Sequence, residues 1–241
     1  MEEIVTGKQM KELDAYTIET MGVPSLVLME RAGLQVFESM KKEGLPLSKV
    51  LVLCGSGNNG ADGVVIARLL FLAGYQVHVC ILGNPEHFTK EMKTQIEIGR
   101  NYGISFVKTF CVHEYTTIVD ALLGVGLSRE VSGLYRETIE KLQDFSGKIA
   151  AVDIPSGIDA DTGAVWGCAV RADLTVTFAY KKAGLCLYPG AAYAGKLLTA
   201  DVGIYRKDKR SPELFACTDR ELKKLTRKPD GNKGSFGKVF L

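Results

Sequence analysis

The chain has 241 residues, a formal net charge of +2 at pH 7, 46% hydrophobic residues and 26 glycines, which favours one globular α/β domain. A charge this close to zero gives no reason to expect nucleic acid or an anionic membrane as a partner. No apolar run approaches the roughly 20 residues of a spanning helix, and the charged N-terminus lacks a signal-peptide core, so we expect a cytoplasmic protein.

The cysteines are scattered along the chain and form no CxxC pair. Two of them fall in apolar strand patterns, where a thiol acts as a small hydrophobic side chain. This usage predicts reduced packing cysteines rather than a disulfide or zinc framework. The positions are Cys54, Cys80, Cys111, Cys168, Cys186 and Cys217.

Residues 7–43 have the apolar spacing of two helices, which are separated by a break at residues 21–24. Glu30 falls on the second helix beside Arg31, and we expect it to be solvated or ion-paired. The next segment, Val50–Leu53, is an unbroken apolar run. Such a run is typical of a strand buried on both faces of a parallel sheet.

A glycine turn, GSGNNG at residues 55–60, follows this strand and leads into a helical pattern. It fits the pattern G-x-G-x-x-G, in which backbone N–H groups face a phosphate. We expect Asn58 and Asn59 to cap the helix and Asp62 to lie in its first turn. Asparagine also serves plain turns, because it tolerates left-handed backbone geometry, and this alternative stays open.

The second strand, at residues 76–82, ends in Gly83 and Asn84. A dinucleotide-binding dehydrogenase places an acidic residue at this point to hold the ribose. The acid is missing, and the glycine turn instead carries two amides and Asp62. The sequence therefore indicates a polar, phosphate-bearing ligand but disfavours an ordinary NAD-dependent oxidoreductase.

Strands and helices alternate along the rest of the chain, which predicts a three-layer, doubly wound, mostly parallel sheet of Rossmann-like type with extra N-terminal helices. Asp120 and Asp153 end two of the strands, so both are expected at the carboxyl edge of the sheet, where ligands gather. Ser156 follows closely. Each of these residues also has a structural alternative, as a helix cap or a side-chain turn. The expected elements are helices at 89–101 and 134–145 and strands at 104–107, 117–120, 148–153, 174–179 and 197–204.

Asp159 and Asp161 continue a tight polar turn after Pro155. Turns rich in aspartate and glycine also bind calcium, but the EF-hand order of ligands is not met here. We therefore do not expect a calcium site.

Four segments together resemble the YjeF N-terminal domain family, the NAD(P)H-hydrate epimerases. They are GSGNNGADG at 55–63, DALLGVGLSRE at 120–130, VDIPSGIDADTG at 152–163 and KAGLCLYPGA at 182–191. Two long motifs in the right order are much more specific than one glycine pattern. The resemblance covers about residues 1–212, and Ala61 departs from it, since the family commonly has glycine there.

The resemblance implies an isomerase that interconverts the R and S forms of NAD(P)H hydrate at C6 of the nicotinamide ring. It implies Asp153 as the catalytic group that also touches the substrate, a potassium ion held by Asn59, Asp120 and Ser156, and a homodimer. A non-catalytic nucleotide-binding or protein-interaction module on the same fold is the alternative. The residues implied to line the nucleotide site are Asn58, Asn59, Gly60, Ala61, Asp62, Gly124, Val125, Gly126, Leu127, Ser128, Arg129 and Glu130.

Residues 213–241 differ in character from the rest. A short polar helix is expected at 219–227, and NKGSFGKVFL at 232–241 resembles the opening of the ADP/ATP-dependent NAD(P)H-hydrate dehydratase domain. We therefore expect a linker and the truncated start of that second domain after an epimerase domain at 1–212.

Overall fold

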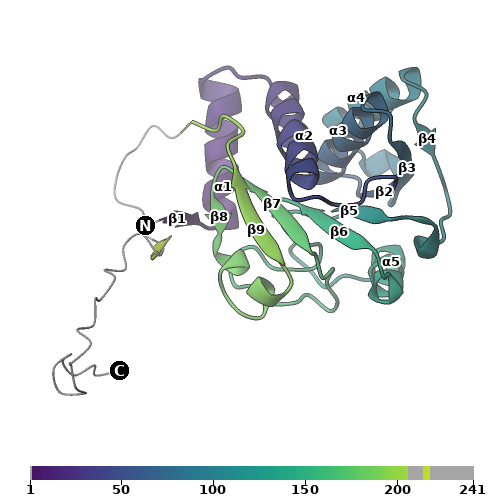
Figure 1. Cartoon of the computed structure of the whole chain (residues 1–241). Coiled ribbons are helices and arrows are strands. Elements are labelled where there is room, and N and C mark those ends of the chain that lie inside the picture. The colour runs from purple at the N-terminus through teal and green to yellow at the C-terminus, as the bar shows by residue number, and fades with distance from the viewer. Residues whose placement is uncertain (1, 206–213, 218–241) are drawn as a thin grey trace, which may run out of the picture.

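The structure is a computed structural model that describes residues 2–205 and 214–217. Its centre is a seven-stranded sheet in the order β4-β3-β2-β5-β6-β7-β9, with every neighbouring pair parallel (Figure 1). The strands are β2 (Lys49–Cys54), β3 (Gln76–Ile81), β4 (Ser105–Phe106), β5 (Thr117–Ala121), β6 (Lys148–Val152), β7 (Leu174–Phe178) and β9 (Lys196–Ala200).

Helices cover both faces of this sheet and give three layers (Figure 1). The apolar run of β2 shows why, since Val50 and Val52 pack into the core under α2, α3 and α4, while Leu51 and Leu53 pack into the core under α5. The predicted fold is confirmed. The helices are α2 (Ser25–Lys42), α3 (Asn58–Leu72), α4 (Lys90–Asn101) and α5 (Gly133–Lys141), with 3₁₀ turns at Pro85–His87, Val112–Glu114, Leu142–Asp144, Ala183–Leu185 and Gly190–Ala192.

The direction of winding reverses between β2 and β5. The chain passes from β2 outward to β3 and β4, then returns to β5 on the other side of β2 and continues outward to β9. At such a reversal the loops after neighbouring strands diverge and leave a crevice at the carboxyl edge. The glycine turn and the loop after Asp120 flank this crevice.

A second, three-stranded sheet was not predicted. Strand β1 (Glu2–Val5) lies between β10 (Leu214–Ala216) and β8 (Lys181–Lys182), parallel to β8 and antiparallel to β10. Strands of two to four residues are too short to show an alternating pattern. They matter here because β1 leads into the first helix and β8 carries Lys182.

The expected N-terminal helices are present. Helix α1 (Gly7–Ala15) begins with a capping box between Thr6 and Gln9, and a π-helical turn (Tyr16–Thr20) extends it. The Gly7 N–H donates to the Asp161 carboxylate at 2.5 Å, so the aspartate-rich turn after β6 anchors this helix. Glu30 pairs with Arg68 of α3, as expected of an ion-paired charge.

Some predicted boundaries were wrong. Strand β9 ends at Ala200 rather than residue 204, and Asp153 follows β6 instead of closing it. The helix expected at 219–227 lies outside the described residues. In the part of the chain that the structure describes, every helix is too short or too polar to cross a membrane.

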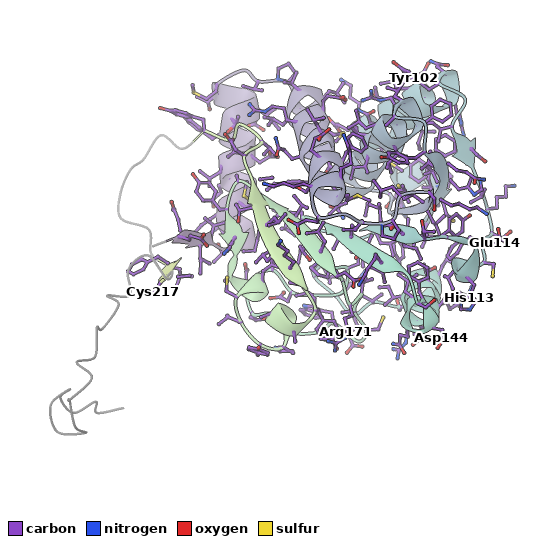
Figure 2. All side chains as sticks on the ribbon, viewed as in Figure 1. Tyr102, His113, Glu114, Asp144, Arg171 and Cys217 are labelled. Atoms are coloured by element: carbon purple, nitrogen blue, oxygen red, sulfur yellow. The ribbon has the colours of Figure 1, made fainter. Side chains whose placement is uncertain are left out.

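All six cysteines are free thiols, and Cys111 is exposed rather than packed in the core. Cys54 and Cys80 lie buried in the central strands. Cys217 is exposed beside β10 at the edge of the molecule, as Figure 2 shows.

Candidate functional site

The glycine turn and the loop after β5 approach each other closely. A Cβ atom on Gly55 would lie 1.9 Å from the carbonyl oxygen of Leu122, and one on Gly60 would lie 2.0 Å from the carbonyl oxygen of Gly55. Both positions therefore require glycine. The helix cap is Gly57, which has no side chain to donate or accept, so the expected capping by Asn58 and Asn59 was wrong.

Helix α3 therefore starts without a side-chain cap, and its first backbone N–H groups remain available to an anionic ligand. Asp62 lies one turn further into the helix than predicted, so its carboxylate does not complement the helix dipole at the N-terminus. Its side chain instead lines a hollow at the carboxyl edge of the sheet.

This outer hollow has a volume of about 610 Å³. It brings together most of the residues that the sequence predicted, from the glycine turn, the loop after β5 and the end of β6. Gly60 and Ala61 lie buried beneath the turn, and Glu130 is exposed on the surface. The predicted residues in its wall are Asn58, Asn59, Asp62, Gly124, Val125, Gly126, Leu127, Ser128, Arg129 and Asp153.

Asp153 has a left-handed backbone, with φ of 66°, directly after β6. Asp and Asn adopt this conformation more readily than other non-glycine residues. Its Oδ1 atom accepts hydrogen bonds from Thr177 Oγ1 at 3.0 Å, from the Phe178 N–H at 3.0 Å and from Lys182 Nζ at 2.5 Å. Its Oδ2 atom has no hydrogen-bond partner among the described residues, and Asp153 lines the outer hollow.

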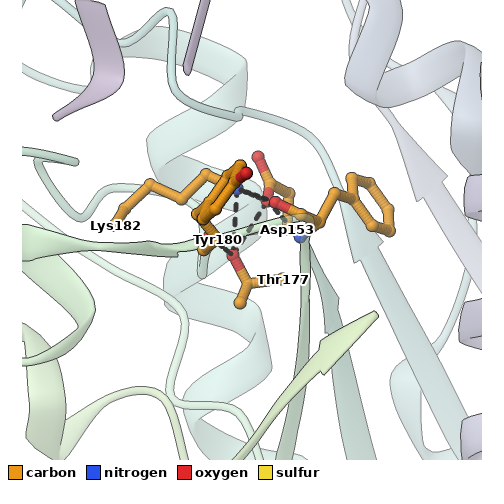
Figure 3. A network of polar contacts seen from close by, with 5 residues as sticks. Asp153, Thr177, Tyr180 and Lys182 are labelled. Carbon is orange, nitrogen blue, oxygen red and sulfur yellow. Dashed lines mark hydrogen bonds and ion pairs between the residues drawn. The ribbon is translucent and has the colours of Figure 1, made fainter. Parts of the chain in front are cut away.

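Lys182 is the buried cation of this network. Its side chain is 0% exposed, and its ammonium group also donates to Thr177 Oγ1 at 3.1 Å and to the Phe178 carbonyl at 2.9 Å. Figure 3 shows the lysine side chain reaching the Asp153 carboxylate with Thr177 beside them. One carboxylate oxygen is thereby fixed, and the other is left open to a ligand.

Two further carboxyl groups lie near Asp153. The Asp62 side chain is partly exposed to the hollow and is otherwise enclosed by protein. This burial raises the pKa of Asp62 well above the ordinary value. The charges of Asp153 and Asp14 raise it further. Burial also raises the pKa of Asp14, with Asp153 adding to the rise and Lys182 opposing it. The site therefore holds protonatable carboxyls next to an ion-paired one.

A smaller inner cavity of about 160 Å³ lies next to the outer hollow. The two share Lys11, Asp14, Asn58, Asp62, Val125, Asp153 and Phe178 in their walls. Lys182 also borders the inner cavity. Its other walls are mainly apolar side chains of α1, α2 and the segment after β9: Met10, Ile18, Leu28, Met29, Ala32, Val202 and Ile204.

Asp120 and Ser156 are fully buried below the outer hollow. Asp120 accepts hydrogen bonds from the Ser156 N–H at 2.8 Å and from Ser156 Oγ at 2.6 Å. Burial raises the Asp120 pKa to about 6, and hydrogen bonds from Ser156 and Leu122 offset this only partly. Among the described residues, no lysine or arginine pairs with it. The Asn59 Nδ2 atom is also buried without a partner.

By the chemistry of their side chains, these residues fit a hard cation. A buried carboxylate without a counter-charge is costly, and oxygen donors suit a hard cation. Asp120, Ser156 and the side-chain oxygen of Asn59 are such donors. The aspartate-rich turn does not form such a site, because the Asp159 carboxylate is occupied by Thr162 and Trp166, and Asp161 holds Gly7.

The comparisons with known proteins agree on one family. Residues 25–184 match the family described as YjeF-related protein N-terminus. This chain belongs to that family. A protein of Limosilactobacillus reuteri named NAD(P)H-hydrate epimerase is 47% identical over 210 residues, which cover 86% of this chain and 99% of the relative. A protein of the same name from Lentilactobacillus buchneri is 46% identical, with 86% and 97% covered.

A solved structure in the comparison supports the same fold. The crystal structure of yeast ynu0 superposes with a TM-score of 0.69 at 25% identity, and the match covers 76% of this chain and 83% of the yeast chain. In this member of the YjeF-related family, the glycine turn between β2 and α3 lies at the position where the sheet reverses its winding.

Sequence reasoning missed two charged residues of this site, Asp14 and Lys182. Lys182 stands in a motif quoted for its family resemblance, yet a lysine beside a second lysine gives no sign of being fully buried. Asp14 lies in a charged segment whose pattern indicates only an amphipathic helix. At the end of β3, where a dehydrogenase carries its ribose acid, the Tyr135 hydroxyl donates to the Leu82 carbonyl at 3.1 Å.

Proposed function

We propose that this protein is an isomerase that interconverts the R and S forms of NAD(P)H hydrate at C6 of the nicotinamide ring. The observation that carries the proposal is the Asp153 carboxylate, whose Oδ1 atom is fixed by Lys182 while its Oδ2 atom is open to a ligand-sized hollow. The curated relatives with this activity in their name support it, since one of them is matched over 99% of its length.

The reaction needs proton transfer at one oxygen atom. C6 lies next to the ring nitrogen and carries a hydroxyl group. Its configuration is lost when the protonated hydroxyl leaves as water and the nitrogen lone pair forms an iminium, or when the ring opens and recloses. Re-addition of water to the other face, with loss of a proton, completes the exchange. No electrons are gained or lost overall.

Asp62 and Asp153 have complementary states for this task. A carboxyl with a raised pKa holds its proton to higher pH than an ordinary aspartate and can donate it, whereas an ion-paired carboxylate can accept one. We assign Asp62 the role of acid and Asp153 Oδ2 the role of base in one direction, with the roles exchanged in the other. General acid–base catalysis of this kind contributes about 10²–10⁴-fold.

We further propose a potassium ion held by Asn59, Asp120 and Ser156. The uncompensated burial of Asp120 supports this assignment. The ion would neutralise the buried carboxylate and hold the strand-end loops together. Asp120 would then remain ionised and keep its hydrogen bonds to Ser156.

The proposal is tested by following R- and S-NADHX by chromatography over time, with and without the protein, at several potassium concentrations. We expect the two epimers to equilibrate faster with protein and faster still with potassium. Thermal stabilisation by the nucleotide without any acceleration of epimer exchange would instead support a non-catalytic binding module.

The remaining assignments are also proposals. We assign residues 1–212 to the epimerase domain and 213–241 to a linker and the start of a dehydratase domain, in a cytoplasmic homodimer. Mass measurement of the native gene product tests the fusion, because a product of only 26.2 kDa would exclude it. Light scattering tests the dimer, and cell fractionation tests the location.

A further inference from the structure

We infer that the inner cavity is the binding site of the hydrated nicotinamide ring and that the outer hollow holds the ADP-ribose part of the substrate. This inference rests on the proposed function and specifies how the substrate lies in the site. It depends on three observations: the sizes of the two spaces, the charges at their junction and the open oxygen of Asp153.

The size of the inner cavity fits a single six-membered ring. Its volume is about 160 Å³, close to the roughly 150 Å³ of an apolar cavity that holds one benzene molecule. An adenine nucleotide is too large for it. The outer hollow, at about 610 Å³, has the volume of a typical site for a drug-sized ligand of roughly 300–1,000 Å³.

The lining of the inner cavity also fits the ring. The two faces of the ring are apolar, and Met10, Leu28 and Ala32 offer apolar walls. The ring carries a hydroxyl and a carboxamide, which need polar partners when buried. Asp14, Asn58 and Asp62 provide donors and acceptors at the polar side of the cavity.

Charge sets the direction in which the dinucleotide lies. Lys11, Asp14, Asp62 and Asp153 line both spaces, so their junction has no excess of positive charge that would favour a diphosphate. The uncapped start of α3 and Arg129 lie in the outer hollow and attract phosphates. With the diphosphate held there, the ring must extend past the junction.

This direction brings C6 to the reacting groups. Asp62 and Asp153 line both spaces, so a ring that enters the inner cavity from the outer hollow passes directly beside these carboxyls. The apolar walls contributed by α1 and α2 then lie against the ring. The N-terminal helices are therefore part of the substrate site.

The inference is tested by filling the inner cavity. Ala32→Leu adds volume from α2, and Ile18→Phe does so from a different element, so that a folding defect in one variant leaves the other. Ala73→Leu is the matched control, because Ala73 is exposed at the end of α3. For each variant, binding of NADHX and of ADP-ribose, which lacks the ring, is measured by calorimetry together with the epimerisation rate.

We expect both filling variants to lose about 10²-fold or more in epimerisation rate, because a displacement of about 1 Å costs this much. NADHX binding should weaken to the level of ADP-ribose binding, while ADP-ribose binding stays within about threefold of wild type. The control should match wild type in every measurement.

Three outcomes would overturn the inference: full activity in the filled variants, equal weakening of NADHX and ADP-ribose in variants that remain folded, or wild-type protein that binds NADHX no more tightly than ADP-ribose. A wild-type protein without epimerisation activity would refute the proposed function instead. In that case a selective loss of NADHX affinity in the filled variants would still support the ring site.

Discussion

The buried pair between Asp153 and Lys182 makes a quantitative prediction about stability. Asp153→Asn keeps the shape of the side chain and tolerates the φ of 66°, but it leaves the Lys182 ammonium with only neutral acceptors, Thr177 Oγ1 and the Phe178 carbonyl. Breaking a buried ion pair by removing one partner costs about 3–5 kcal/mol. We expect Asp153→Asn to lose this amount of unfolding free energy.

Lys182→Met removes the cation instead. Asp153 then keeps two donors, Thr177 Oγ1 and the Phe178 N–H, and its side chain remains 11% exposed to the hollow. A smaller loss of about 1–3 kcal/mol is expected for a carboxylate that retains these partners. The double variant holds no uncompensated charge, so it should be more stable than the sum of the single losses predicts. We expect a coupling energy of about 2 kcal/mol.

The assay is denaturant unfolding of wild type, both single variants and the double variant, with the slope compared among them to confirm a common unfolding transition. All three variants should lack epimerisation activity, because Asp153 is either replaced or no longer held by Lys182. Additive losses in stability would show that the pair is not coupled and would refute the reasoning from its burial.

The other predictions concern the acid, the glycine turn and the cation. Asp62 donates only when protonated and its pKa is raised, so kcat should fall as pH rises through that pKa, and Asp62→Asn should lower kcat and remove this alkaline fall; an unchanged pH profile would exclude Asp62. Gly60→Ala places a Cβ 2.0 Å from the Gly55 carbonyl oxygen and should cost about 1–3 kcal/mol in thermal unfolding, with loss of nucleotide binding. Ser156→Ala removes an oxygen donor beside Asp120 and should raise the potassium concentration for half-maximal activity at least about tenfold, whereas an unaltered potassium titration would remove Ser156 from the cation site.

The chain sequence was sufficient to predict the large sheet and its active edge. Unbroken apolar runs such as Val50–Leu53 are typical of strands buried on both faces of a parallel sheet, and the intervening helices allow neighbouring strands to point the same way. The carboxyl ends of such strands meet at one edge. Asp120 and Asp153 therefore had to lie near the glycine turn, and the structure places them there.

Only the tertiary structure decided which charged side chains come together at the carboxyl edge of the sheet. Lys182 reaches Asp153 because β8 pairs with β1, and Asp14 reaches the same place because α1 follows β1 and is anchored by Asp161. Periodicity and turn motifs describe the backbone over a few neighbouring residues. They cannot report the docking of short strands and a helix from opposite ends of the chain, on which the ion pair and the inner cavity depend.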